Sequence, residues 1–278
     1  MARRLIHLSD IHFGRVDPGI LSPLVGHVNG LKPHVVVVSG DLTQRARIPE
    51  FEQARSFLDR LPRPQIVVPG NHDVPLYSPY GRFVQQFNRF RRFITDDLEP
   101  EYIDREIAVL GINTARSLTW KGGRVGHGQI SRVKHKLCGL SERVIKVVVT
   151  HHPFELPDGF SSSALVGRSR MAMERLAECG ADLLLAGHLH VSHVCNTTQR
   201  YQIHGHSAIV AQAGTAMSTR GRGERNSFNS ITVDSRHITV ERWLWNPIDG
   251  IFESACRESY VKAAEGWLLA RIPEVELK

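Results

Sequence analysis

Six short aliphatic runs, each closed by a tight polar turn, constrain what this 278-residue chain can fold into. The runs are Leu5–Leu8, Val35–Val38, Gln65–Val68, Ile107–Leu110, Val144–Val149 and Leu183–Ala186. A strand that is buried on both faces of a sheet has this continuous apolar character. The turns that follow are rich in Gly, Asp and His. We therefore predict an α/β fold whose functional turns lie at the carboxyl ends of its strands.

Segments of helical periodicity separate these predicted strands. In Pro49–Leu61, apolar residues recur at helical spacing behind an N-terminal proline, which is typical of a helix. We also predict helices over Tyr80–Phe93 and over Arg170–Cys179, which ends before the C-cap candidate Gly180. The pattern extends to Leu21–Leu31, although two glycines interrupt it.

The chain changes character after the last of the six runs. Val191–Asp234 has the composition of strands and turns, and Ile238–Trp245 alternates, which favours a second, more antiparallel sheet. We predict a terminal helix within Glu253–Leu269. A catalytic domain is thus expected over residues 1–246, with a C-terminal extension, a packed helix, over residues 247–278.

Composition is that of a globular protein, with 41% hydrophobic and 23% charged residues. Apolar runs are far shorter than the roughly 18–20 residues of a membrane span, and the first residues lack a secretory signal. The four cysteines, Cys138, Cys179, Cys195 and Cys256, form no C-x-x-C pair, so we predict reduced thiols in a cytoplasmic protein. A net charge of +7 and an excess of Arg over Lys predict an anionic partner.

Five of the predicted strand ends carry side chains that bind metal ions. They are Asp10-Ile11-His12, Gly40-Asp41, Gly70-Asn71-His72-Asp73, His151-His152-Pro153 and Gly187-His188-Leu189-His190. Carboxylate oxygens with neutral imidazoles suit first-row divalent ions rather than a cysteine-based structural zinc site. A glycine before the ligand lets the chain turn sharply with nothing bulky beside the ion. Each motif alone is a weak signal, but five in this order predict a metal centre.

In this order, the motifs resemble those of the calcineurin-like metallophosphoesterase superfamily. The pattern runs from Asp10 to His190, about two thirds of the chain. The stretches LSDIHFG, SGDLTQ and PGNHD, with AGTA at Ala213–Ala216, are similar to the class III cyclic-nucleotide phosphodiesterase branch. The resemblance implies a four-layer α/β-β/α sandwich of two mixed sheets, with a dinuclear metal site at the strand ends.

The resemblance also implies which residues bind the two divalent ions, which would be Mn, Fe, Zn or Co. One ion would be held by Asp10, His12 and His190, and the other by Asn71, His151 and His188, with Asp41 bridging both. The H-x-P frame favours His151 over the adjacent His152, which would then line the pocket, but the choice stays open. A hydroxide that bridges the ions would attack the phosphorus in line.

Residues next to these ligands are implied to contact the substrate. His72 would stabilise the transition-state oxygen or protonate the leaving alkoxide. Asp73 either orients His72 or caps the turn. Asn71, His72 and His152 would line the substrate pocket, and Arg15, which follows His12-Phe13-Gly14, is a further candidate.

Two loops are left without an assigned role by the motifs, and they cover residues 157–169 and 218–227. In the second loop, Arg220 and Arg222 follow the AGTA stretch, where they either reach over the pocket or lie in solvent.

These features imply a metal-dependent phosphodiesterase that hydrolyses a small phosphodiester of the cyclic-nucleotide or glycerophosphodiester type. The alternative is a nuclease or broad phosphatase on the same site. The Arg content favours nucleic acid, whereas the lack of a stacking-aromatic array and of a concentrated basic stripe speaks against it. A metal-free scaffold would have lost ligands, yet every ligand position is filled. The resemblance also favours a homodimer.

Overall fold

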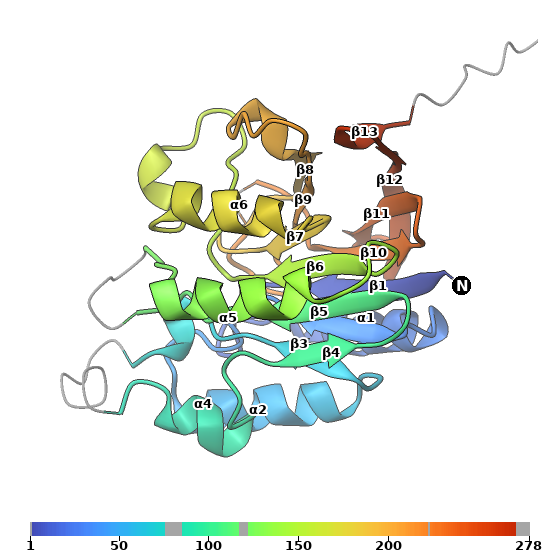
Figure 1. The fold of residues 1–278 in the computed structure, drawn as a ribbon. Helices are drawn as coiled ribbons and strands as arrows, with labels where there is room; N and C mark the ends of the chain where they lie inside the picture. Colours follow the sequence, from blue (N-terminus) through green and yellow to red (C-terminus); the bar gives the residue numbers. More distant parts are fainter. Residues whose placement is uncertain (1, 76–84, 117–121, 222, 271–278) are drawn as a thin grey trace, which may run out of the picture.

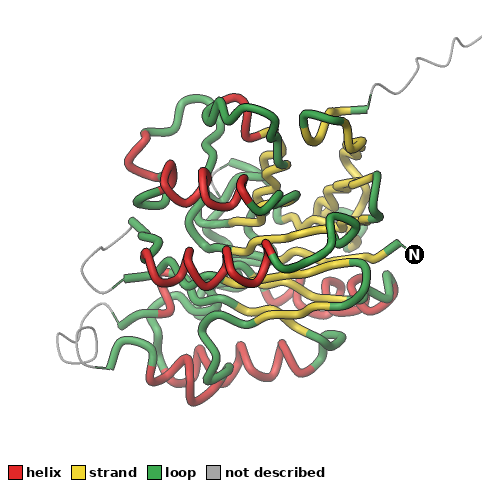
Figure 2. Tube along the Cα trace, viewed as in Figure 1, coloured by secondary structure: helices red, strands yellow, loops and turns green. Residues whose placement is uncertain are grey.

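The computed structural model describes residues 2–75, 85–116, 122–221 and 223–270. Two mixed β-sheets lie face to face, and helices cover their outer faces (Figure 1). The helices therefore flank the strands rather than mixing with them (Figure 2). The predicted four-layer α/β-β/α sandwich is confirmed.

The first sheet has the strand order β13-β12-β11-β10-β1-β2-β3. Its parallel half consists of β1 (Arg3–Leu8), β2 (Val35–Val38) and β3 (Gln65–Val67). Its antiparallel half consists of β10 (Ser227–Val233), β11 (His237–Asn246), β12 (Ile251–Ala263) and β13 (Gly266–Leu269). Strand β1 joins the halves, because it pairs parallel with β2 and antiparallel with β10.

The second sheet has the strand order β4-β5-β6-β7-β9-β8. Its parallel centre consists of β5 (Ile107–Gly111), β6 (Ile145–Val149), β7 (Leu183–Ala186) and β9 (Ile209–Gln212). The antiparallel strands β4 (Glu101–Ile103) and β8 (His193–Asn196) form its two edges. All six predicted strands are therefore present, and each of them pairs in parallel with a neighbour; the parallel strand β9 is an addition to them.

Burial on both faces explains why these strands are apolar without alternation. Leu5 and Val35 point between the two sheets, whereas their neighbours Ile6 and Val36 point towards the helices. Helices α1 (Pro18–Gly30), α2 (Ile48–Asp59) and α4 (Asn88–Phe93) cover the first sheet. Helices α5 (His127–Cys138) and α6 (Ser169–Glu178) cover the second. Short 3₁₀ turns lie at η1 (Asn71–Asp73), η2 (Ser162–Ala164) and η3 (Thr197–Gln199).

The predicted helices are confirmed for α1, α2 and α6. For α4 the prediction is met only in part, and α5 has no predicted counterpart. Of the predicted helix Tyr80–Phe93, residues 80–84 lie outside the described part of the chain, and α4 is the part observed. Helix α5 was not predicted, although its buried residues Ile130, Val133 and Leu137 have helical spacing. None of the helices in the described ranges combines the length and the apolar character needed to cross a bilayer.

The predicted helix within Glu253–Leu269 is wrong, because this segment forms β12 and β13. Strand β12 pairs with β11 from Asn246↔Ile251 to His237↔Val261. The buried Phe252 packs on the helix-covered face of the sheet, whereas the buried Tyr260 lies between the two sheets. The faces switch because the register with β11 shifts between Arg242 and Trp243. In the sequence, Phe252, Cys256 and Tyr260 are spaced four residues apart, which is typical of one face of a helix, and this is why the pattern misled.

The prediction of four reduced thiols is also wrong, because Cys138 and Cys179 form a disulfide with a Cα–Cα distance of 4.5 Å. The bond links the end of α5 to the residue that follows α6. It depends on these two helices lying side by side, which cysteine spacing does not reveal. Cys195 and Cys256 are free thiols, as expected.

Candidate metal centre

The predicted ligands meet where parallel strands of both sheets end. Because β1, β2, β3, β6 and β7 have their carboxyl ends at one edge of the sandwich, turns far apart in sequence become neighbours. Asp10, His12, Asp41 and His190 form one group whose ligand atoms lie within 4.8 Å of one another. His151, His152 and His188 form a second group that satisfies the same limit.

Unusual backbone geometry is concentrated in these turns. Five of the predicted ligands have a positive φ: Asp10 (50°), His12 (52°), Asp41 (52°), His188 (72°) and His190 (60°). A residue with a side chain rarely adopts this left-handed conformation, which costs on the order of 1–3 kcal/mol each. The surrounding fold therefore holds these residues in a strained conformation. This conformation directs their side chains towards one another.

Glycine beside the ligands provides space, as the sequence predicts. A Cβ added to Gly40 would lie 2.6 Å from Nδ1 of His151 and 2.9 Å from the Cα of Gly70. At Gly70 and at Gly187 an added Cβ would approach a carboxylate oxygen of the neighbouring turn even more closely. Side chains at these glycines would therefore occupy the space of predicted ligands.

Backbone carbonyls orient three of the imidazoles in the same way. The Nδ1 atoms of His12, His151 and His190 face the carbonyl oxygens of Thr43, Ser39 and Arg220 at 3.3, 2.7 and 2.9 Å. Because a carbonyl oxygen only accepts, each Nδ1–H donates, and in the neutral ring the lone pair is on Nε2. Metal-binding histidines are typically held this way, with the second ring nitrogen bound to a carbonyl.

In the first group, three hydrogen-bond acceptor atoms face one another with no donor between them. His12 Nε2 and His190 Nε2 lie 3.2 Å apart, and Asp10 Oδ1 lies 3.6 and 3.2 Å from them. Among the described residues, this buried Oδ1 has no hydrogen-bond partner. The other oxygen, Oδ2, accepts from the Ser9 hydroxyl at 2.7 Å and from the His188 N–H at 2.8 Å. Three converging acceptors repel unless a cation or protons lie between them, so this donor set fits a divalent ion.

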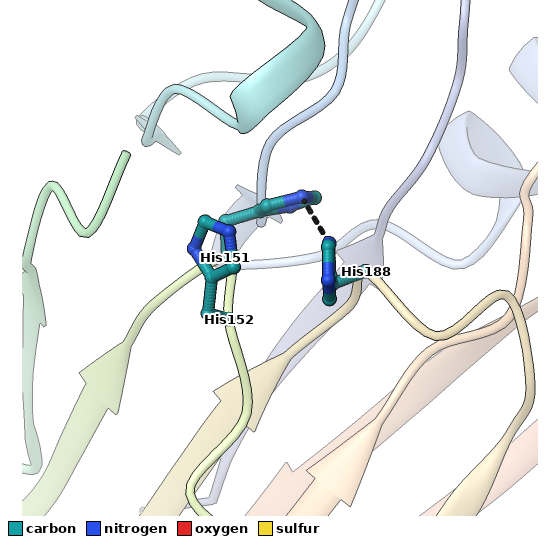
Figure 3. A group of neighbouring side chains, drawn as sticks. All are labelled: His151, His152 and His188. Carbon is teal, nitrogen blue, oxygen red and sulfur yellow. Dashed lines mark hydrogen bonds between the residues drawn. The ribbon is translucent and has the colours of Figure 1, made fainter. Parts of the chain in front are cut away.

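Asp41 lies between the two groups with one carboxylate oxygen towards each. Its Oδ1 is 3.4 Å from His151 Nε2, and its Oδ2 is 3.7 Å from His12 Nε2. His151 Nε2 is also 3.1 Å from the side-chain oxygen of Asn71 and 3.3 Å from Nδ1 of His188 (Figure 3). The second group thus adds an amide oxygen to its imidazoles, which suits the same class of ion.

The two adjacent histidines have different surroundings. His151 faces Asp41, Asn71 and His188 through Nε2. His152 has its Nδ1 2.8 Å from the Thr114 hydroxyl, and its ring is tilted against His188 with centroids 4.5 Å apart (Figure 3). These contacts favour His151 as a ligand and His152 as a packed neighbour of the second group.

Two buried carboxylates dominate the electrostatics. Burial alone raises the pKa of Asp10 and Asp41, but the surrounding histidines hold both pKa values well below the usual range. Burial lowers the pKa of His151, but the charge of Asp41 more than offsets this and raises it to about 9. Burial and the nearby His151 lower the pKa of His188 to about 3. The centre therefore attracts positive charge while it resists protonation at His188, as a cation site requires.

Asp73 contacts its own turn and the loop that follows β2 rather than the His72 ring. Its carboxylate accepts from the N–H groups of Gly70, Leu42 and Thr43 at 2.9, 3.2 and 2.9 Å, and from the Thr43 hydroxyl at 3.0 Å. Burial, with the nearby charge of Asp41, raises the pKa of Asp73 to about 6. These hydrogen bonds match the turn-capping alternative, and the ring of His72 is held instead by the Gln44 carbonyl, 2.8 Å from its Nδ1.

Two contributions to the site, those of His7 and Ser39, were not predicted. His7 is fully buried on β1 with Nε2 2.8 Å from the Ser39 hydroxyl, and burial lowers its pKa to about 3. Ser39, immediately before Gly40-Asp41, accepts from His151 through its carbonyl, a position that could have been noticed in the motif. For Arg220 the sequence left two alternatives, over the pocket or in solvent, and its side chain lies against His72, with Nη1 3.0 Å from His72 Nε2.

Of the other two predicted arginines, Arg15 and Arg222, the structure describes only Arg15. Arg15 is exposed, and its described hydrogen bonds are made by its main chain. Its N–H donates to the His12 carbonyl at 2.8 Å, and its carbonyl accepts from the N–H of Thr219 at 2.8 Å. Arg222 lies outside the described residues.

Comparison with known proteins adds three findings. The model of the calcineurin-like phosphoesterase family matches residues 3–192. A glycerophosphodiester phosphodiesterase, GpdQ of Enterobacter lignolyticus, is 39% identical over 80 residues. The match covers 25% of this chain and only 29% of that protein.

Solved structures with the same fold have low sequence identity. PhoD aligns with 99% of this chain and 72% of its own, at a TM-score of 0.72 and 10% identity. Purple acid phosphatase PPD1 from yellow lupin (Lupinus luteus) aligns with 93% of this chain and 53% of its own, at a TM-score of 0.69 and 14% identity. Identities this low demonstrate a shared fold and nothing finer.

Proposed function

Since the chain belongs to the calcineurin-like phosphoesterase family, and is thus a metal-dependent hydrolase of phosphoric esters, we propose that it is a phosphodiesterase. Its substrates are small phosphodiesters of the glycerophosphodiester or cyclic-nucleotide type. The observation that carries the proposal is the convergence of imidazole Nε2 atoms and carboxylate oxygens around Asp41. The partial match to a protein named a glycerophosphodiester phosphodiesterase supports the substrate class.

The proposed centre holds two divalent ions of Mn, Fe, Zn or Co. Asp10, His12 and His190 hold one, Asn71, His151 and His188 hold the other, and Asp41 contacts both. Such a pair supplies Lewis-acid stabilisation of phosphoryl oxygens and a water of lowered pKa. This division is supported by the two oxygens of Asp41, because Oδ2 faces Nε2 of His12 and Oδ1 faces Nε2 of His151.

His72 is the proposed residue at the leaving group. Its main-chain N–H donates to Asp41 Oδ1 at 2.8 Å, which holds the backbone beside the centre, and its Nδ1–H donates to the Gln44 carbonyl, which orients the ring. Nε2 is then the ring atom that faces the reacting ester. Stabilising or protonating the leaving alkoxide from this position contributes roughly 10²–10⁴-fold to the rate.

The proposal is tested by activity of the purified protein after supplementation with each of the four metals. We expect turnover of bis(p-nitrophenyl) phosphate, glycerophosphodiesters and cyclic nucleotides to exceed turnover of p-nitrophenyl phosphate. Activity on single-stranded DNA alone, or on monoesters alone, would refute the phosphodiester proposal in favour of a nuclease or phosphatase.

Metal content of variants tests the site separately. His188→Ala should bind one ion fewer per chain and lose most activity. His237→Ala is the matched control, because His237 is exposed at the turn between β10 and β11. Equal metal content in the two variants would contradict the role of His188.

A homodimer is a further proposal, and size-exclusion chromatography with light scattering tests it.

A further inference from the structure

Arg220 is a basic side chain at the metal centre to which neither the motifs nor the comparisons assign a role. We propose that Arg220 binds the phosphoryl oxygens of the substrate, and that before substrate arrives its guanidinium holds His72 in a single tautomer. This inference rests on the proposed function, because it assigns the anion-binding group of the same site.

The contact between Arg220 and His72 defines the direction of the hydrogen bonds. Arg220 Nη1 lies 3.0 Å from His72 Nε2 and 3.4 Å from the side-chain oxygen of Gln44. A guanidinium always donates, so His72 Nε2 accepts. The proton of the neutral ring is then on Nδ1, which donates to the Gln44 carbonyl at 2.8 Å. Two contacts from opposite sides thus leave His72 one neutral tautomer.

The charge of Arg220 is not neutralised by the partners described for it. Both of those side-chain partners are neutral, an imidazole and an amide. Some arginines elsewhere in the described ranges face carboxylates, for example Arg200 with Glu155 and Arg3 with Asp104. Guanidinium groups bind phosphate through paired, charge-assisted hydrogen bonds. A phosphoryl anion is therefore a stronger partner for the Arg220 guanidinium than either of the neutral groups that it now contacts.

The backbone of Arg220 belongs to the metal centre as well. Its carbonyl accepts from His190 Nδ1 at 2.9 Å, and its N–H donates to the Ser218 hydroxyl at 3.1 Å. The preceding residue, Thr219, donates its N–H to the Arg15 carbonyl at 2.8 Å. The main chain is thus held against two neighbouring turns, and only the side chain has to rotate to exchange His72 for a substrate oxygen.

This exchange links binding to the next step of the reaction. Once Arg220 donates to a phosphoryl oxygen, Nε2 of His72 loses its donor. Nε2 can then take up a proton from solvent and donate it to the leaving-group oxygen when substrate is in place, while Nδ1–H stays bound to the Gln44 carbonyl. Arg220 is in this way a substrate-binding residue that also positions His72.

The test compares Arg220→Gln and Arg220→Lys with Arg225→Gln, an exposed arginine of the same loop. Inorganic phosphate is the probe, and its affinity for the metal-loaded protein is measured by calorimetry. We expect Arg220→Gln to weaken phosphate binding about tenfold or more, the range for a lost charge-assisted hydrogen bond, with metal content unchanged. Arg220→Lys should recover part of the affinity, and Arg225→Gln should behave as wild type.

A second readout uses the metal-free protein. Long-range ¹H–¹⁵N spectra of the His72 ring should report the Nδ1–H tautomer in wild type and a mixture of tautomers in Arg220→Gln. For diester hydrolysis, the same variant should raise KM more than it lowers kcat.

Several outcomes would overturn the inference. They are phosphate affinity that is equal in wild type and Arg220→Gln, a wild type that binds no phosphate, or loss of metal in the variant, which would trace the effect to His190. If phosphate binding depends on Arg220 but no diester is hydrolysed, the proposed function fails while the inference stands. If diesters are hydrolysed with unchanged KM and phosphate affinity in the variant, the inference fails alone.

Discussion

Replacing Gly40 by alanine tests whether the turns are shaped around the metal ligands. Gly40 has a φ of +96°, a conformation that alanine adopts with strain. The new methyl group would lie 2.6 Å from Nδ1 of His151 and 2.8 Å from its Cγ. On its other side it would meet the backbone of Gly70 at 2.9 Å, which cannot rotate away as a side chain could.

The expected loss of stability follows from two contributions. The backbone strain of a left-handed alanine is about 1–2 kcal/mol. Inserting a methyl group into a filled, buried space adds about 1–3 kcal/mol. We therefore expect Gly40→Ala to lower the free energy of unfolding by about 2–5 kcal/mol. Because the imidazole of His151 is displaced from the Ser39 carbonyl, we also expect weaker metal binding.

Gly26→Ala is the matched control for this experiment. Gly26 is exposed in the middle of α1, and an added Cβ there meets nothing within 4 Å. Since alanine is the better helix former, this variant should be more stable by up to about 1 kcal/mol. Urea unfolding and metal analysis of both variants provide the comparison. If Gly40→Ala unfolds like wild type and retains its full metal content, the reasoning about the turn is refuted.

Three further variants test other parts of the centre and the fold. Asn71→Ala should lose one ion and most activity while circular dichroism stays that of the wild type; full metal content would contradict its role. His72→Ala should keep both ions and slow diesters with poor leaving groups by roughly 10²–10⁴-fold, and equal rates on all diesters would contradict a role at the leaving group. Cys138→Ser opens the disulfide to Cys179, 41 residues away, and should lower the free energy of unfolding by about 4 kcal/mol. Urea unfolding measures this loss, and wild type under reducing conditions should show it too; a wild type that is insensitive to reductant would count against it.

Prediction from the sequence was successful where both faces of an element are buried. Strand β2 is four valines with no exposed face, so its apolar run has no competing interpretation as a surface helix. Strand β12 has exposed residues along much of its length, and its apolar residues recur every four positions. Its partner β11, rather than its own pattern, makes it a strand. Helix α5 was overlooked for a related reason, because basic and polar residues interrupt its three buried positions.

The sequence by itself determined the chemistry available to this protein. Carboxylates, imidazoles and an amide after buried strands predict an ion-binding edge, since parallel strands end together. Only the tertiary structure decided where each lone pair points. His12, His151 and His190 are each oriented by a carbonyl of a turn other than their own, and Arg220 contacts His72, which lies 148 residues away in the sequence. Motifs specify residue types within one turn, whereas hydrogen-bond direction depends on the turn packed against it.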